Sequence, residues 1–89
     1  MTRHYLVVYE PGTLNWSGFA PDVPGCVSTG TTATELRRNL SEALEFHLEG
    51  LVLDGAAMPE AVTHVVEVPE GGAAEWLEVA LPVGEVVSA

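Results

Sequence analysis

The chain has 89 residues, which is enough for one small domain spanning residues 1–89 and too few for a second hydrophobic core. Hydrophobic residues make up 47% of it, which excludes a disordered chain, and no apolar run is long enough for a bilayer span or a signal peptide, so we expect a cytoplasmic protein. The formal net charge of −10 argues against direct nucleic-acid binding and favours a basic protein partner.

The first part of the chain predicts three short strands with tight connections. Tyr5–Tyr9 is rich in β-branched and aromatic residues and is followed by Pro11-Gly12, which ends it. Asn15–Ala20 and Cys26–Thr29 have the composition of a second and a third strand. Because parallel neighbours need a longer crossover, these three strands are expected to form an antiparallel meander.

A long amphipathic helix follows. Thr32 and Glu35 form a capping box at its start, and Gly55 suits the C′ position at its end. Gly50 costs about 1 kcal/mol relative to alanine inside a helix, so it either packs tightly on the sheet or marks an early break. Apolar residues recur at helical spacing on one face, which comprises Ala33, Leu36, Leu40, Ala43, Leu44, His47, Leu48 and Leu51. The opposite side carries an acidic stripe of Glu42, Glu45 and Glu49.

Beyond Pro59 the pattern is less regular, and the structure of residues 60–75 is left open. Val62–Val68 has strand composition, whereas Trp76–Leu81 shows the alternation that is typical of a strand. A crossover through the helix is expected to place that strand parallel to the first, in the sheet order 3-2-1-4. The predicted fold class is therefore α+β, in the order β-β-β-α-β. Residues 82–89 form a tail that either pairs with another subunit or is flexible.

The first strand is apolar on both faces. Leu6 and Val8 point to one side of it, and Tyr5, Val7 and Tyr9 point to the other. One helix covers only one face of a sheet, so a second copy, a partner protein or the later part of the chain must cover the other. Because a domain of this size also benefits from extra buried area, we expect at least a homodimer.

The corner between the second and third strands and the end of the helix carry a family resemblance. An aromatic strand, a Pro-Asp-Val-Pro-Gly-Cys corner and a helix ending Leu-Glu-Gly-Leu with Asp-Gly occur in that order. This pattern resembles the HicB-like antitoxins, the acidic halves of bacterial toxin–antitoxin pairs. The matching residues, which we interpret as structural, include Phe19, Pro21, Asp22, Pro24, Gly25, Cys26, Gly50 and Gly55.

The resemblance implies a truncated RNase H-like sheet and an interaction function. Members of the family mask a small basic HicA-type ribonuclease toxin and block its catalytic histidine, which requires no catalytic residue in the antitoxin. Many members also carry a C-terminal ribbon-helix-helix or helix-turn-helix module that binds the operator. No basic helical segment precedes Ala89 in this chain, so we do not expect operator binding.

The residues themselves give little support for an enzyme. Two-metal hydrolysis needs converging carboxylates, but Tyr5–Tyr9 contains none. Glu10 follows that strand and Glu78 lies in the predicted fourth strand, and no recognisable spacing places a third and a fourth acid beside them. Cys26 has no neighbouring base in the sequence that would lower its pKa, and it suits a small buried hydrophobe. No metal-ligand spacing connects the three histidines, which are His4, His47 and His64. We therefore expect neither catalysis nor a metal or cofactor.

Two features are candidates for partner binding. Glu42, Glu45 and Glu49 are either an ordinary solvated helix face or a docking surface for a basic protein. Trp16, and with it Trp76, is either an interface anchor or part of a small core. The leading interpretation is an antitoxin-like interaction protein. The alternatives are a stand-alone homo-oligomeric domain without a toxin and a cryptic RNase H-like hydrolase.

Overall fold

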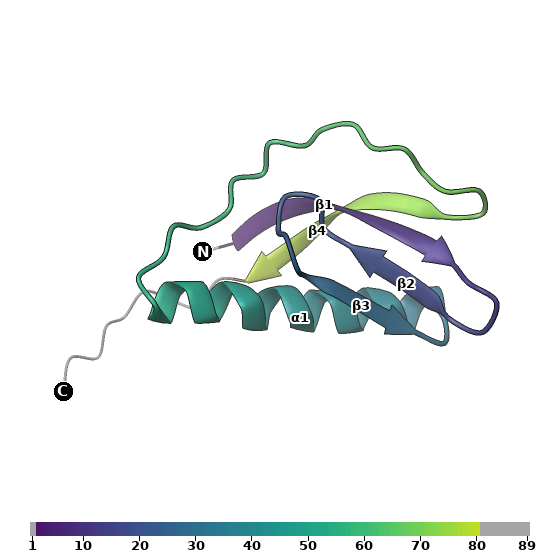
Figure 1. The fold of residues 1–89 in the computed structure, drawn as a ribbon, viewed down its shortest axis with the longest axis horizontal. Coiled ribbons are helices and arrows are strands. Elements are labelled where there is room, and N and C mark those ends of the chain that lie inside the picture. Colours follow the sequence, from purple (N-terminus) through teal and green to yellow (C-terminus); the bar gives the residue numbers. More distant parts are fainter. Residues whose placement is uncertain (1, 81–89) are drawn as a thin grey trace.

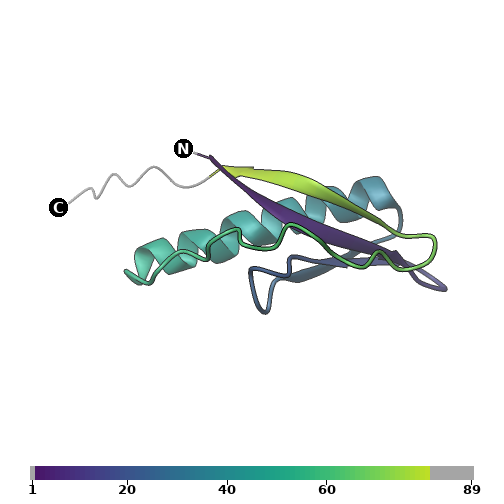
Figure 2. The same ribbon diagram turned by 90° about the horizontal axis from the view of Figure 1, so that it is seen from above.

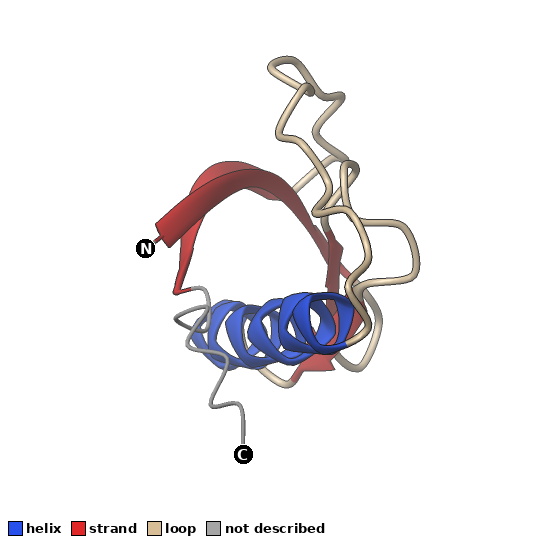
Figure 3. Cartoon of the chain, turned by 90° about the vertical axis from the view of Figure 1, so that its left-hand side faces the viewer, coloured by secondary structure: helices blue, strands red, loops and turns tan. Residues whose placement is uncertain are grey.

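The computed structural model of the protein describes residues 2–80, which form a four-stranded antiparallel sheet with one helix packed on its concave face (Figures 1 and 3). The predicted tail, residues 82–89, lies outside the described residues. The strand order is β3-β2-β1-β4, so the predicted α+β class and the order 3-2-1-4 are confirmed. The elements are β1 (Thr2–Pro11), β2 (Trp16–Phe19), β3 (Val27–Gly30), α1 (Ala33–Leu53) and β4 (Ala73–Ala80).

The predicted direction of the last strand is wrong. β4 runs antiparallel to β1, with Tyr5 opposite Leu77 and Tyr9 opposite Ala73. The cause is the segment 56–72, which leaves the end of α1 and returns along the length of the sheet (Figures 1 and 2). The chain therefore enters β4 beside the end of β1 and has to run back along it. This segment contains Val62–Val68, which forms no strand despite its composition.

The predicted start of α1 is confirmed by its hydrogen bonds. The Thr32 hydroxyl oxygen accepts a bond from the backbone N–H of Glu35 at 3.0 Å. In return, the Glu35 carboxylate accepts from the backbone N–H of Thr31 at 2.9 Å, one residue earlier than in the usual capping box. Two otherwise unsatisfied donors at the helix start are thereby paired.

The end of α1 is a Schellman motif, as Gly55 predicts. Gly55 has a φ of 68° and donates to the carbonyl of Val52 at 3.1 Å, while Ala56 donates to the carbonyl of Leu51 at 2.9 Å. Both interpretations of Gly50 are wrong, because the helix continues through it and a Cβ built there would meet open space.

The core lies between α1 and the concave face of the sheet (Figure 3). The helix contributes four leucines at a spacing of four residues, and each is fully buried, as the apolar periodicity predicts. Ala33, predicted on the same face, is exposed because it stands ahead of the first of these leucines. The buried cluster is made of Tyr5, Val7, Tyr9, Ala20, Val23, Cys26, Leu36, Leu40, Leu44, Leu48, Leu77 and Val79.

The part of the convex face formed by β1 and β4 is covered by the chain itself. Leu6 and Val8 point to this side and are only 6% and 2% exposed. The segment 56–72 runs past β1 and β4 on the side away from α1 (Figures 1 and 3), and its His64 ring lies 5.7 Å from the ring of Trp76, which pairs with Leu6. Of the three possible covers for this face, the chain folding back is the one observed. The burial of Leu6 and Val8 therefore gives no reason to require a second copy.

Candidate functional site

The outward side of α1 carries the predicted acidic stripe. Glu42, Glu45 and Glu49 are all exposed and lie opposite the buried leucines. The last turn of the helix contains no basic residue, and Asp54 follows as its C-cap. From Glu42 onward the helix carries no lysine or arginine, and its C-terminal end adds a partial negative charge of its own, so the charges of this surface are negative.

Two apolar side chains that were not predicted as site residues stand in the same surface. Phe46 is 80% exposed and Leu53 is 79% exposed. Phe46 follows Glu42 by four positions and precedes Glu49 by three, so these side chains are neighbours on one face of the helix. A helical projection of α1 could have found them, because both fall outside the apolar face. We call the five residues Glu42, Glu45, Phe46, Glu49 and Leu53 the outer helix face.

Trp16 lies at the other end of the molecule from this surface. It begins β2, is half-buried against the core cluster, and pairs with Gly30 just before α1. Together with Thr31 and the β1–β2 turn it lines a shallow open notch of ≈ 220 Å³. At a rise of about 1.5 Å per residue, Glu42 to Glu49 stand roughly 15–25 Å further along the helix. The structure therefore does not bring the predicted partner-binding residues into one site.

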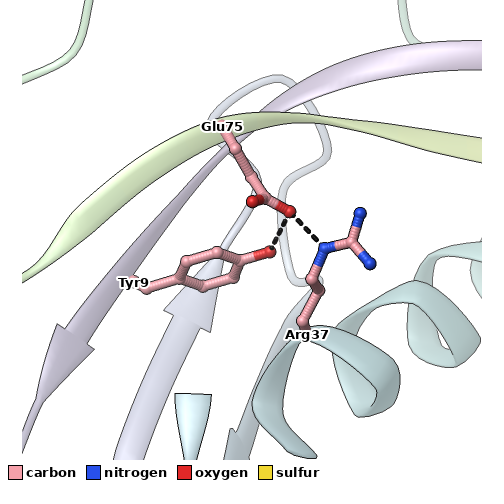
Figure 4. A network of polar contacts seen from close by, with 3 residues as sticks. All are labelled: Tyr9, Arg37 and Glu75. Carbon is pink, nitrogen blue, oxygen red and sulfur yellow. Dashed lines mark hydrogen bonds and ion pairs between the residues drawn. The ribbon is translucent and has the colours of Figure 1, made fainter. Parts of the chain in front are cut away.

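A polar network that the sequence did not predict joins β1, β4 and α1 (Figure 4). The Tyr9 hydroxyl donates to Oε1 of Glu75 at 3.0 Å, and Nε of Arg37 donates to the same oxygen. Burial, together with the hydrogen bond to Glu75, raises the pKa of Tyr9 well above its ordinary value. The hydrogen bond and charge of Glu75 likewise raise the pKa of Arg37. Because both partners donate to the same oxygen, this carboxylate links β1 and α1 to β4.

The corner that carries the family resemblance fastens the segment 56–72. Asp22 accepts two hydrogen bonds from Thr63, at 2.9 Å from the backbone N–H and 2.6 Å from the hydroxyl. Burial alone would raise the pKa of Asp22, but these bonds, helped by Val62 and by the nearby His64, hold it below its ordinary value. Gly25 adopts a φ of 83°, which favours glycine at this turn.

The residues considered for catalysis in the sequence do not form an active site among the described residues. Burial raises the pKa of the Cys26 thiol, which disfavours a nucleophile. Glu78 is paired with His4 at 3.4 Å, while Glu10 is exposed near the end of β1. Between residues 2 and 80, no group of three or more His, Cys, Asp or Glu side chains could hold a metal ion. In that same stretch, no helix combines the length and apolar character needed to cross a membrane.

A small α+β domain with an exposed acidic helix is suited to act by contact with another protein. The chain matches the family model of the HicB-like antitoxins of bacterial toxin–antitoxin systems over residues 5–86. It therefore belongs to this family, as the Pro21–Cys26 corner and the helix end predict. This is a family of antitoxins and not of enzymes, which confirms the expectation of a non-enzymatic protein.

Solved structures share the fold. One is a chain of a HicA3 and HicB3 toxin–antitoxin complex, with a TM-score of 0.67 and 23% identity, covering 90% of this chain and 99% of that one. Another is the antitoxin HicB of Burkholderia pseudomallei, with a TM-score of 0.68 and 25% identity, covering 91% of this chain and 64% of that one.

Two curated relatives match shorter stretches. The chain is 46% identical over 41 residues to an uncharacterised 14.9 kDa protein of Haemophilus phage HP1, which spans 46% of this chain and 31% of the phage protein. It is 43% identical over 44 residues to a UPF0150 protein of Thermotoga maritima, which spans 49% of this chain and 59% of that protein. The matches thus cover less than two thirds of either relative.

Proposed function

We propose that this protein is the antitoxin of a small basic HicA-type ribonuclease, which it neutralises in the cytoplasm by covering the active site. The observation that carries the proposal is the family match over residues 5–86. The similarity to a chain of a HicA3–HicB3 complex indicates the class of partner. Neutralisation by covering needs complementary surface and no catalytic group.

Charge gives this proposal a physical basis. A ribonuclease must carry a cationic surface in order to hold the phosphates of RNA. A chain with a net charge of −10 is attracted to that same surface and competes with the substrate for it. Glu42, Glu45 and Glu49 are the proposed contacts on the helix, and Trp16 remains a proposed anchor at the opposite end.

The test is co-expression with the basic protein of fewer than about one hundred residues that we expect the neighbouring gene to encode. The toxin alone should arrest growth and cleave RNA, and this chain should restore growth and form a complex at micromolar concentration. An unrelated acidic domain of similar size and charge is the control, and it should not restore growth. Failure of this chain both to restore growth and to form a complex would contradict the proposal.

A homodimer is a second proposal, which rests on the convex face of the sheet. Phe19 and Val27 pair with each other beside Val8 and are 43% and 68% exposed, so this end of the face keeps uncovered apolar surface. The same surface would suit a stand-alone homo-oligomeric domain without a toxin. Analytical ultracentrifugation at micromolar concentration should show a dimer, and F19S/V27S should shift it toward monomer. A monomeric wild-type chain would contradict this proposal.

A further inference from the structure

We propose that the outer helix face is the docking surface for the basic partner, with Phe46 and Leu53 as apolar anchors inside an acidic rim. This inference rests on the proposed function and adds to it the residues that hold the complex together. The acidic stripe alone explains attraction at a distance, but exposed ion pairs contribute little to the lifetime of a complex. A stable complex needs a desolvated apolar centre.

The two apolar side chains are placed to act together. Phe46 and Leu53 are separated by seven positions, which is about two turns of helix, so they stand in line along the same side of α1. Both remain about four-fifths exposed, although the helix buries its four core leucines completely. A large aromatic and a leucine in line on a folded helix are the kind of anchors that helix-in-groove recognition uses.

Gly50 shapes the surface between them. It lies four positions after Phe46 and three before Leu53, and therefore between the two anchors on the helix surface. A Cβ placed there would meet no atom within 4 Å, so the surface has a gap at this point. The helix offers two apolar knobs with a recess between them, and a partner side chain fits into that recess.

The acidic residues around Phe46 indicate which kind of partner binds the outer helix face. Glu42 and Glu49 flank Phe46, the last turn holds no basic residue, and Asp54 caps the helix end. A second copy docked here by two-fold symmetry would place these carboxylates against their own counterparts, which is unfavourable. Nucleic acid is repelled for the same reason. The fitting partner is a protein that presents an apolar socket bordered by arginine or lysine side chains.

The two kinds of residue have separable kinetic effects. Charges on an exposed rim act mainly on the association rate, and their effect weakens as salt screens them. Apolar anchors act mainly on the dissociation rate, because they are desolvated only in the bound state. Two sets of substitutions on the same helix face should therefore change different rate constants: loss of the charges should lower the association rate, and loss of the anchors should raise the dissociation rate.

The experiment measures binding of the purified chain to a catalytically inactive variant of the neighbouring basic toxin by surface plasmon resonance. We expect F46A/L53A to raise the dissociation rate about 30-fold or more, with an association rate within about threefold of wild type. We expect E42Q/E45Q/E49Q to lower the association rate about tenfold at low salt and to reduce its salt dependence. All of these positions are exposed, and alanine and glutamine favour helix, so the fold should be retained.

The matched control is V62A/V65A, which truncates two apolar side chains that are 67% and 88% exposed but lie outside α1. Its binding kinetics should equal those of wild type. G50Q fills the recess with a helix-favouring side chain, and it should raise the melting temperature while weakening binding about tenfold or more. This variant separates docking from folding, because its effects on the two run in opposite directions.

Wild-type binding together with an unchanged dissociation rate in F46A/L53A would overturn the inference and leave the proposed function in place. Full-strength binding by G50Q would overturn it in the same way. If F46A/L53A converts a dimer to a monomer without affecting the toxin, the surface is an interface between copies and the inference is wrong. If the wild-type chain does not bind the toxin, the inference and the proposed function both fail.

Discussion

At Gly50, α1 contains the residue type that most weakens a helix interior apart from proline. The helix nevertheless continues through it, and a Cβ would meet no neighbour. We therefore expect Gly50→Ala to stabilise the fold by about 0.5–1 kcal/mol, since alanine has less backbone freedom to lose on folding. In a domain of this size that gain raises the melting temperature by several degrees, roughly 4–8 °C per kcal/mol.

Gly55→Ala is the matched control for this prediction, and calorimetry of both variants is the measurement. Gly55 adopts a φ of 68°, which strains any residue with a Cβ, so this substitution should destabilise the protein. A loss of stability in Gly50→Ala would contradict this prediction, because it would mean that the folded protein requires glycine at this position.

The Asp22 carboxylate should make stability depend on pH in the acid range. Its pKa in the folded protein lies below the ordinary value near 3.9 because Thr63 donates two hydrogen bonds to it. A depressed folded pKa contributes stability that is fully present above the unfolded pKa and is lost as the pH falls through the folded one. We expect the wild-type melting temperature to drop below about pH 4 more steeply than that of Asp22→Asn.

Thr63→Val tests the same contact from the other side. It removes the hydroxyl donor and leaves the backbone donor in place, so the acid-range slope should lie between those of wild type and Asp22→Asn. Carboxyl chemical shifts followed from pH 2 to 6 give the Asp22 pKa directly. Equal slopes in all three proteins would show that the contact with Thr63 does not stabilise the ionised form.

At the scale of the elements, the sequence predicts what is encoded locally. The Thr32–Glu35 cap, the leucine spacing and Gly55 define α1 within a short stretch of chain, and each of these signals is confirmed. The predicted direction of β4 is wrong because it depends on the path of segment 56–72, which has no periodicity to show that it crosses the molecule again. The link between Asp22 and Thr63 joins residues 41 positions apart, which no local pattern reveals.

In the candidate site too, local features could be predicted from the sequence and long-range contacts could not. The acidic stripe is visible as a helical period, and Phe46 and Leu53 are visible in the same projection when the exposed side is searched for apolar residues. The network of Tyr9, Glu75 and Arg37 cannot be recognised in the sequence. Its hydrogen bonds span 66 and 38 positions and depend on the antiparallel register of β4. Long-range polar contacts of this kind follow from topology and not from composition.

The Tyr9–Glu75–Arg37 network joins β1, β4 and α1, so its loss should lower the free energy of unfolding of the whole domain. We expect Glu75→Gln to cost about 1–2 kcal/mol, since the hydrogen bond to the charged carboxylate is weakened at both partners. A double-mutant cycle with Tyr9→Phe, followed by urea unfolding, measures the coupling between the two side chains. Coupling near zero would mean that the tyrosine packs in the core without depending on the carboxylate.

Tyr9 also predicts a response to alkaline pH. Its pKa is raised in the folded protein, first by burial and then by the Glu75 hydrogen bond. A raised folded pKa contributes stability that is fully present below the unfolded pKa, near 10, and is lost as the pH rises through the higher folded value. The wild-type protein should therefore lose stability above about pH 10, and Tyr9→Phe should remove part of that loss. Thermal unfolding between pH 8 and 12 measures the difference.

At the scale of the whole molecule, net charge decides which partners are accessible. With a formal charge of −10, this chain gains no free energy from counterion release when it meets a nucleic acid. It contains three arginines and no lysine, and one of the arginines is already engaged with Glu75. We therefore expect no binding of residues 1–89 to duplex DNA at physiological salt.

Fluorescence anisotropy with labelled duplexes, including the DNA upstream of the gene, measures this directly. A triple reversal, E42K/E45K/E49K, is the informative comparison because it changes the net charge from −10 to about −4 on one exposed face without touching the buried leucines. If net charge alone prevents DNA binding, the wild-type chain should show none. The E42K/E45K/E49K variant should then show at most weak, salt-sensitive binding without sequence preference. Saturable and sequence-specific binding by the wild-type chain would require a recognition surface that its charge distribution does not account for.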